Sequence, residues 1–192
     1  MKQKRETTEK MVFGAILTAL VVILQLLGSF VKLGPFSISL VLIPIVLGAA
    51  TCGKAVSAWL GAVFGVVVLI TDAAAFMAVS VPGTIITVLL KGIACGFVSG
   101  WVYELLVAKN RYVAVAVAAV VCPVVNTGVF ILGCITFFLD TISQWGVSGG
   151  YNNTFAYLFL GMIGINFIAE LVSNIVLSPA IVRLLNIRKK NI

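Results

Sequence analysis

The sequence predicts an all-α integral membrane protein with six transmembrane helices, and three observations support this fold class. Hydrophobic residues make up 61% of the 192 residues and charged residues only 10%, and the mean hydropathy is +1.20. A chain of this composition has too little polar surface for a water-soluble globule. Its apolar runs have the length, about 20 residues, that a membrane-spanning helix needs. Its basic residues gather between alternate runs.

The apolar runs are separated by charged residues, glycines and prolines, which mark turns at a membrane surface. They predict one membrane domain over residues 1–192, with spans at 10–31, 36–52, 55–71, 82–107, 112–139 and 154–185. The first run is longer than the ~7–15-residue core of a signal peptide, so we expect it to be retained as a helix. The second and third runs are short for a full crossing and predict tilted or bent helices.

The distribution of Lys and Arg predicts the orientation, because cytoplasmic loops are rich in these residues. An even number of spans with a cytoplasmic N-terminus places both termini in the cytoplasm. It also places eleven of the 13 cations there: Lys2, Lys4, Arg5, Lys10, Lys54, Lys109, Arg111, Arg183, Arg188, Lys189 and Lys190. The net charge of +7 then reflects topology and an anionic inner leaflet, and no basic patch with interleaved aromatics indicates a nucleic-acid partner.

The sequence lacks most of the residue patterns that indicate an enzyme. It has no histidine, which is the commonest general base and neutral metal ligand. Its four cysteines show no CxxC spacing, and the GxxxxGK[ST] phosphate-binding loop of ATPases is absent. We therefore expect no catalytic residues, no metal and no cofactor.

Lys91, in the stretch "TVLLKGIACG", is the cation that loop bias does not explain. It lies about nine residues into the fourth predicted span, roughly 13 Å below the outer surface. A charge at this depth costs at least ~2.5–3.5 kcal/mol, so it needs a partner, a water-filled cavity or an anionic ligand. Two interpretations stay open: a structural ion pair with Glu170, and an anion-binding site.

Amide side chains form a second group of candidates. Asn166, Glu170 and Asn174 recur at four-residue spacing and share one face of the last predicted helix. Asn126 follows Pro123, whose ring frees a backbone carbonyl in the fifth span. These groups either hydrogen-bond between helices or contact a ligand, and for Asn174, near the cytoplasmic side, we favour the first interpretation.

Two further features are open to two interpretations. The predicted fifth loop, residues 140–153, contains Trp145, Tyr151 and Asn153 among glycines, which are either anchors at the membrane interface or parts of a flexible lid. In the first span, Ala15 and Ala19 lie one turn apart, and such a pair lets another helix approach closely, although it also arises by chance.

Together these features resemble the substrate-binding S component of an energy-coupling factor (ECF) vitamin transporter. The resemblance rests on a basic N-terminal stub, the Ala-x-x-x-Ala pattern of "AILTA", and six spans without an ATPase motif. The stretches "FSISLVLIPIVLGAATCGKAVSAWLGAVFG" and "LLKGIACGFVSGWVYELL" are similar to the second to fourth helices of the family. The resemblance covers nearly the whole chain.

The resemblance implies a multi-pass protein of the bacterial plasma membrane that binds a vitamin with high affinity. In the family, an Ala-x-x-x-Ala face, here Ala15 and Ala19, docks on a transmembrane coupling subunit driven by two ATPase subunits. The ligand lies under the first and fifth loops, which implies substrate contacts for Lys91, Asn126, Asn166, Glu170, Trp145, Tyr151 and Asn153. A buried cation near amides favours a carboxylate-bearing vitamin, with pantothenate the leading choice.

Other function classes stay open from the sequence alone. The main alternative is a self-sufficient secondary transporter that uses Glu170 as its proton-coupling carboxylate. An intramembrane enzyme would need a constellation of reactive residues, and none is visible. A purely structural bundle would use Lys91 and the amides only for packing.

Overall fold

The computed structural model describes the backbone of residues 2–30, 32–33, 36–37 and 40–190, and the side chains of residues 8–30 and 40–186. Helices dominate. In chain order the elements are α1 (Lys2–Gly28), β1 (Lys32–Leu33), β2 (Phe36–Ser37), α2 (Leu42–Cys52), α3 (Lys54–Thr71), α4 (Ala74–Met77), α5 (Val81–Leu106), α6 (Arg111–Phe137), α7 (Leu139–Ser148), α8 (Thr154–Ala156), the π-helix η1 (Tyr157–Ile163) and α9 (Gly164–Lys190). The two short strands pair antiparallel.

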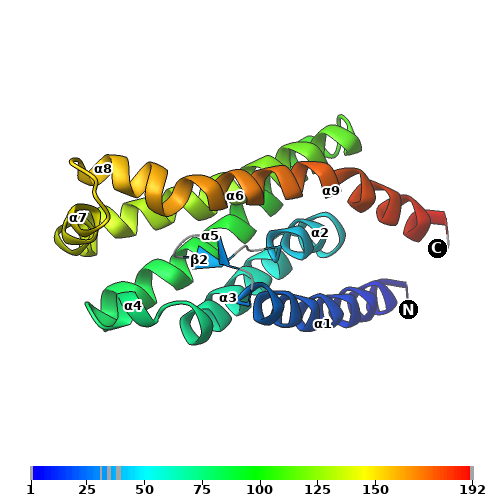
Figure 1. The fold of residues 1–192 in the computed structure, drawn as a ribbon. Coiled ribbons are helices and arrows are strands. Elements are labelled where there is room, and N and C mark those ends of the chain that lie inside the picture. Colours follow the sequence, from blue (N-terminus) through cyan, green and yellow to red (C-terminus); the bar gives the residue numbers. More distant parts are fainter. Residues whose placement is uncertain (1, 31, 34–35, 38–39, 191–192) are drawn as a thin grey trace.

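Helix α5 is the centre of the bundle. It packs against α3 on one side and α6 on the other, α6 packs against α9, and α1 and α2 pack against α3 (Figure 1). The start of α1 and the end of α9 lie at one end of the bundle, which we call the terminal end. Helices α4, α7 and α8 lie at the opposite end, the loop end (Figure 1).

Local sequence explains where the central helices begin. Ser80 caps α5 by accepting a hydrogen bond from the backbone N–H of Gly83, and Pro82 occupies the first turn, where no N–H is needed. Asn110 caps α6 by accepting from the N–H groups of Tyr112 and Val113. Both helices therefore start at fixed residues.

Five helical segments of the described residues are long and apolar enough to cross a membrane: Thr8–Gly28, Lys54–Thr71, Val81–Leu106, Arg111–Phe137 and Thr154–Asn186. The predicted span at 36–52 is corrected. Residues 36–37 form β2, and α2 has only 11 residues. At 1.5 Å per residue α2 is about 16 Å long, about half of a ~30 Å hydrocarbon core.

The predicted loop at 140–153 is largely helical, which is a second correction. Helix α7 covers Leu139–Ser148, and a turn at Gly149 and Gly150 follows it. Leu139, Ile142 and Gly146 recur at three- and four-residue spacing, and the last two are buried. This periodicity gives α7 one apolar face.

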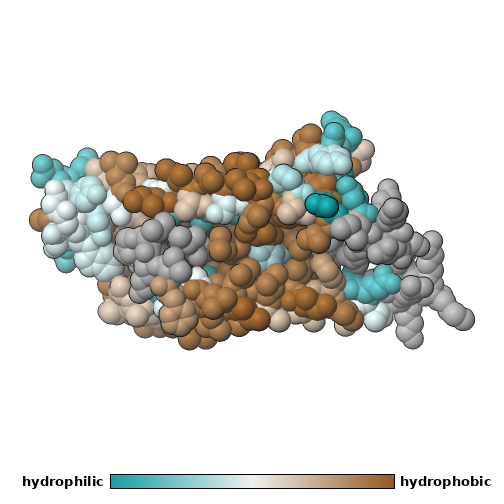
Figure 2. Space-filling view, turned by 45° about the vertical axis from the view of Figure 1, so that its right-hand side comes forward, coloured by the Kyte–Doolittle hydropathy of each residue, from teal (hydrophilic) through white to brown (hydrophobic). Residues whose placement is uncertain are grey.

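The outer surface is divided as expected for a membrane protein. Figure 2 shows a broad hydrophobic band with hydrophilic residues at both ends. Lys54 pairs with Glu104 at 3.0 Å near the terminal end, and Arg111 donates to Asn186 there. The cytoplasmic position of this end stays a prediction.

Glycines allow α3 and α5 to cross in backbone contact. Gly61 of α3 faces Gly92 of α5, and a Cβ atom on either would collide with the backbone carbonyl of the other. A Cβ on Gly96 would similarly meet the Ser57 carbonyl. We call this contact the glycine seam. Because it leaves no room for side chains, it fixes the rotation of α5 against α3.

Two hydrophobic clusters fill the bundle. The larger one includes Leu17, Ile45, Leu60 and Phe64 from α1, α2 and α3, and the smaller one lies toward the loop end and includes Phe138. Between them the packing is interrupted by polar residues.

Candidate functional site

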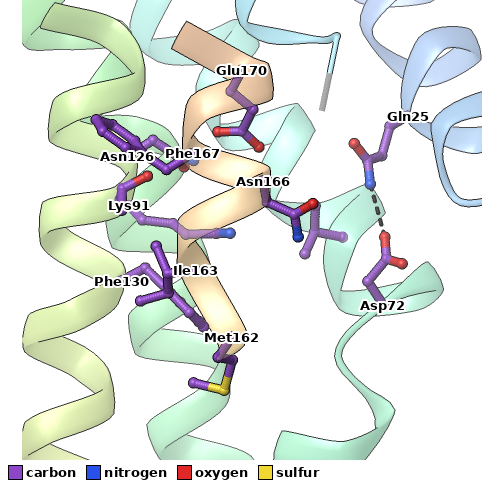
Figure 3. A pocket seen from close by; sticks show the side chains of 12 residues that line it. Gln25, Asp72, Lys91, Asn126, Phe130, Met162, Ile163, Asn166, Phe167 and Glu170 are labelled. Atoms are coloured by element: carbon purple, nitrogen blue, oxygen red, sulfur yellow. Dashed lines mark hydrogen bonds between the residues drawn. The ribbon is translucent and has the colours of Figure 1, made fainter. Parts of the chain in front are cut away.

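A cavity of about 70 Å³ lies where α1, α3, α5, α6, η1 and α9 approach one another (Figure 3). Its lining combines polar and aromatic residues: Gln25, Val68, Asp72, Lys91, Asn126, Thr127, Phe130, Met162, Ile163, Asn166, Phe167 and Glu170. A second cavity of about 40 Å³ adjoins it on the side of Phe76 and Phe138 and shares Val68, Asp72, Lys91 and Phe130 with it.

The glycine seam positions Lys91. This residue precedes Gly92 and therefore projects about 100° around α5 from the seam, into the cavity (Figure 3). Its Nζ atom lies 5.0 Å from the ring centroid of Phe130 and 5.6 Å from that of Phe64. Two aromatic faces thus stabilise the ammonium through cation–π contacts.

Two carboxylates share the cavity with this ammonium. Glu170 of α9 and Asp72 at the end of α3 both line the cavity into which Lys91 projects. Glu170 is only 6% exposed and lies one turn from Asn166 on α9. The cavity thus carries a formal charge of about −1 when all three groups are ionised.

Several amide atoms of the cavity have no hydrogen-bond partner in the part of the chain that the structure describes. Oδ1 of Asn126 and both polar atoms of Asn166 are buried without a hydrogen bond to any described residue. Leaving such a group unpaired costs about 1–3 kcal/mol, so atoms of this kind need an explanation at a native site. A polar ligand that enters the cavity supplies one.

Asn174 lies outside this cavity, although its Oδ1 is likewise buried without a hydrogen bond to a described residue. Its Nδ2 donates to the backbone carbonyl of Glu170 at 2.9 Å, and its side chain is not part of the cavity lining. This hydrogen bond lies within α9, so the structure gives Asn174 a local contact where the sequence suggested one between helices.

Sequence analysis missed three polar residues of the cavity, Gln25, Asp72 and Thr127. Gln25 Nε2 donates to Asp72 Oδ2 at 2.9 Å across α1 and α3 (Figure 3). Gln25 is the one amide in an apolar run that extends from Met11 to Leu27, so the argument applied to Lys91 would have found it. Asp72 ends α3, and in the sequence it is indistinguishable from an ordinary loop charge.

The three predicted residues of the fifth loop lie outside both cavities. Trp145 of α7 packs edge-to-face on Phe76, with ring centroids 5.5 Å apart. Tyr151 contacts the ring of Tyr157. Asn153 caps α8, where its Oδ1 accepts from the N–H of Phe155 at 2.8 Å. The structure therefore brings four of the seven predicted site residues together and leaves these three apart.

The chemistry available to the cavity is that of binding. It offers an ammonium, amide donors and acceptors, carboxylates and aromatic walls. Among residues 8–30 and 40–186, no three His, Cys, Asp or Glu side chains are grouped so that they could hold a metal.

Comparison with protein families identifies the process in which this binding takes part. The family model described as "ECF transporter, substrate-specific component" matches residues 9–182. The chain belongs to this family. The resemblance noted in the sequence is thereby confirmed, as is an all-helical membrane bundle. Searches among curated proteins and among solved structures found no match.

This S component is a non-catalytic subunit of an ATP-driven importer in the cell membrane. It binds a substrate and works with the partner subunits of an ECF module. Membership in the family favours this role over the self-sufficient secondary transporter that the sequence left open. It does not identify the substrate.

Proposed function

We propose that the S component binds a carboxylate-bearing vitamin with high affinity, and that pantothenate is the leading choice. The observation that carries this proposal is the position of Lys91. Its ammonium lies in a cavity whose amides, Asn126 and Asn166, have polar atoms without a partner among the described residues. A substrate that joins a carboxylate to hydroxyl or amide groups matches both features.

In the proposed complex Lys91 donates a charge-assisted hydrogen bond to the substrate carboxylate. Such bonds are shorter and stronger than those between neutral groups. Asn126 and Asn166 take up the neutral polar groups of the substrate. Glu170 neutralises Lys91 while the site is empty and gives up that role when the substrate carboxylate arrives.

The size of the cavity bears on how a substrate enters. About 70 Å³ accommodates a few water molecules, less than a vitamin requires. We therefore propose that binding joins this cavity to its neighbour, which shares Lys91 and Phe130 with it. Trp145, Tyr151 and Asn153 are proposed to close over the substrate together with the first loop. In that loop, the described residues leave out 31, 34–35 and 38–39.

The partner subunits are proposed to be a transmembrane coupling subunit and two ATPase subunits. Ala15 and Ala19 lie one turn apart on α1, and both are exposed. Their small side chains would let a helix of the coupling subunit approach closely. In this proposal the chain forms one membrane domain with both termini in the cytoplasm.

The substrate proposal is tested by measuring pantothenate binding to the purified protein and to Lys91→Met. We expect the variant to bind roughly 10- to 100-fold more weakly, because a hydrogen bond to a charged group contributes about 1.5–3 kcal/mol. Lys109→Met, at an exposed site beyond α5, is the matched control. Equal affinity in Lys91→Met and wild type would exclude the carboxylate contact. Native mass spectrometry of the mildly purified protein would identify a retained ligand.

The docking proposal has a separate test. Replacing Ala15 and Ala19 by leucine should abolish uptake and co-purification with the coupling subunit, because the added side chains hold the two helices apart. Substrate binding to the isolated protein should be unchanged. Loss of binding together with uptake would argue against a dedicated docking face.

A further inference from the structure

The wall of the cavity formed by α1 and α3 holds a hydrogen-bonded pair, Gln25 and Asp72, to which the proposed function gives no role. Gln25 is 1% exposed, and its Nε2 donates to Asp72 Oδ2 at 2.9 Å. Thr71 Oγ1 lies 2.8 Å from the same carboxylate oxygen and 3.0 Å from the carbonyl oxygen of Val67, and its single proton can be donated to only one of them. The Asp72 carboxylate thus accepts from Gln25 and competes with Val67 for the Thr71 proton.

This pairing fixes the orientation of the Gln25 amide. A carboxylate only accepts, so Gln25 must turn its NH₂ group toward Asp72 and its carbonyl oxygen away. That oxygen, Oε1, is buried and has no hydrogen-bond partner among the described residues. In Figure 3 it points from α1 into the cavity. The α1–α3 wall therefore presents a buried acceptor that still needs a donor.

The two sides of the cavity offer opposite hydrogen-bonding groups. Gln25 and Asp72 present acceptors on one side, whereas Lys91 presents an ammonium, which only donates, from the other (Figure 3). A simple carboxylate without donor groups would satisfy Lys91 and leave Gln25 Oε1 unpaired.

We infer that the substrate carries at least one O–H or N–H donor at the end that faces α1 and α3, and that Gln25 selects for it. This inference rests on the proposed function, which places the substrate carboxylate at Lys91. Asp72 acts as a positioning residue, because it holds the Gln25 amide in the accepting orientation. The selected class is a small carboxylate with a hydroxyl, amide N–H or ammonium group at the opposite end.

The experiment measures binding of two probes, pantothenate and its analogue in which both hydroxyl groups are replaced by hydrogen. We expect wild type to prefer pantothenate by at least ~10-fold, because a site built to bond a hydroxyl discriminates strongly against its absence. In Gln25→Met, which keeps the length of the side chain but lacks the acceptor, the preference should fall toward onefold. Gln144→Met, at an exposed site on α7, should keep the wild-type preference.

Asp72→Leu tests the positioning role. Leucine is of similar size but cannot accept a hydrogen bond, so the contact that holds the NH₂ group of Gln25 away from the cavity is lost. The preference for pantothenate should then fall at least threefold, because the Gln25 amide has to be ordered when the substrate binds, whereas affinity for the deoxygenated analogue should not fall, since a negative charge has been removed. An unchanged preference in Asp72→Leu would exclude the positioning role.

The outcomes separate this inference from the proposed function. Lys91→Met should weaken both probes by the same factor and keep their ratio, which tests the carboxylate contact alone. Equal binding of both probes to wild type, or an unchanged preference in Gln25→Met, would overturn the role of Gln25 and leave the proposed function in place.

Binding of neither probe would contradict the choice of pantothenate. The inference would then be judged on the molecule that native mass spectrometry detects with the purified protein. A molecule without any O–H or N–H group would overturn it. A molecule with such a group that is lost from Gln25→Met and kept in Gln144→Met would support it.

Discussion

Helix α5 has two contact faces that follow opposite rules. On the face toward α3, Gly61 and Gly92 bring two backbones together and leave no space for an added atom. On the face toward α6 and α9, Lys91 projects into a cavity with amide atoms that have no partner among the described residues. The first face has no space for another atom, whereas the second borders a cavity in which polar atoms have no hydrogen-bond partner among the described residues.

The difference shows how a small membrane protein can hold an unsatisfied binding site. Asn126 and Asn166 have amide atoms without a partner among the described residues, and such atoms lower the stability of the empty protein. Close backbone packing at the glycine seam offsets part of this cost through dispersion contacts. It also fixes the direction in which Lys91 points. The glycine seam thus stabilises a protein whose cavity contains unpartnered polar atoms. Three predictions test this difference between the two faces of α5.

The largest effect is expected at the seam. Gly61→Ala should destabilise the protein by about 3 kcal/mol or more, because the new Cβ collides with the backbone carbonyl of Gly92 and the helices must move apart. The measurement is thermal unfolding in detergent. Gly128→Ala in α6 is the matched control, since its Cβ would meet nothing within 4 Å. Equal stability of the two variants would contradict the packed seam.

A smaller effect is expected at the charge pair of the cavity. Glu170→Gln should bind pantothenate about 10-fold more tightly, because the substrate carboxylate no longer competes with Glu170 for Lys91. The same substitution at Glu104, whose carboxylate pairs with Lys54 at the surface, should leave affinity unchanged. Weaker binding in Glu170→Gln would show that Glu170 contacts the substrate directly.

The smallest change is expected from removing an unpaired amide. Asn166→Leu should leave the free energy of unfolding within about 1 kcal/mol of wild type or raise it, because no protein hydrogen bond among the described residues is lost. Asn110→Leu removes a helix cap and should cost about 0.5–2 kcal/mol. If Asn166→Leu proved the more damaging, its amide would have a structural role.

The sequence predicted those site residues that are polar and lie within an apolar run. Lys91, Asn126, Asn166 and Glu170 stand out because polar groups in apolar runs are expensive, and the structure brings all four to one cavity. Gln25 met the same criterion and was overlooked. Phe130 could not be recognised, because nothing in the sequence distinguishes it from an ordinary lipid-facing or core phenylalanine.

Boundaries that depend on tertiary packing were less accessible. The apolar run at 36–52 continues through β2 and α2 alike, so its composition does not show that the helix starts at Leu42. For α7, glycine and polar residues favoured a loop, although Leu139, Ile142 and Gly146 follow a helical spacing. The helical spacing of α7 was therefore visible in the sequence, but its glycine and polar content outweighed that spacing in the prediction of a loop.

Lys91 also divides two spaces. It lines both the larger cavity and the smaller one beside Phe76 and Phe138. Val68, Asp72 and Phe130 line both cavities with it. These four side chains are the partition between the two spaces, and the volume open to a guest depends on how they are placed.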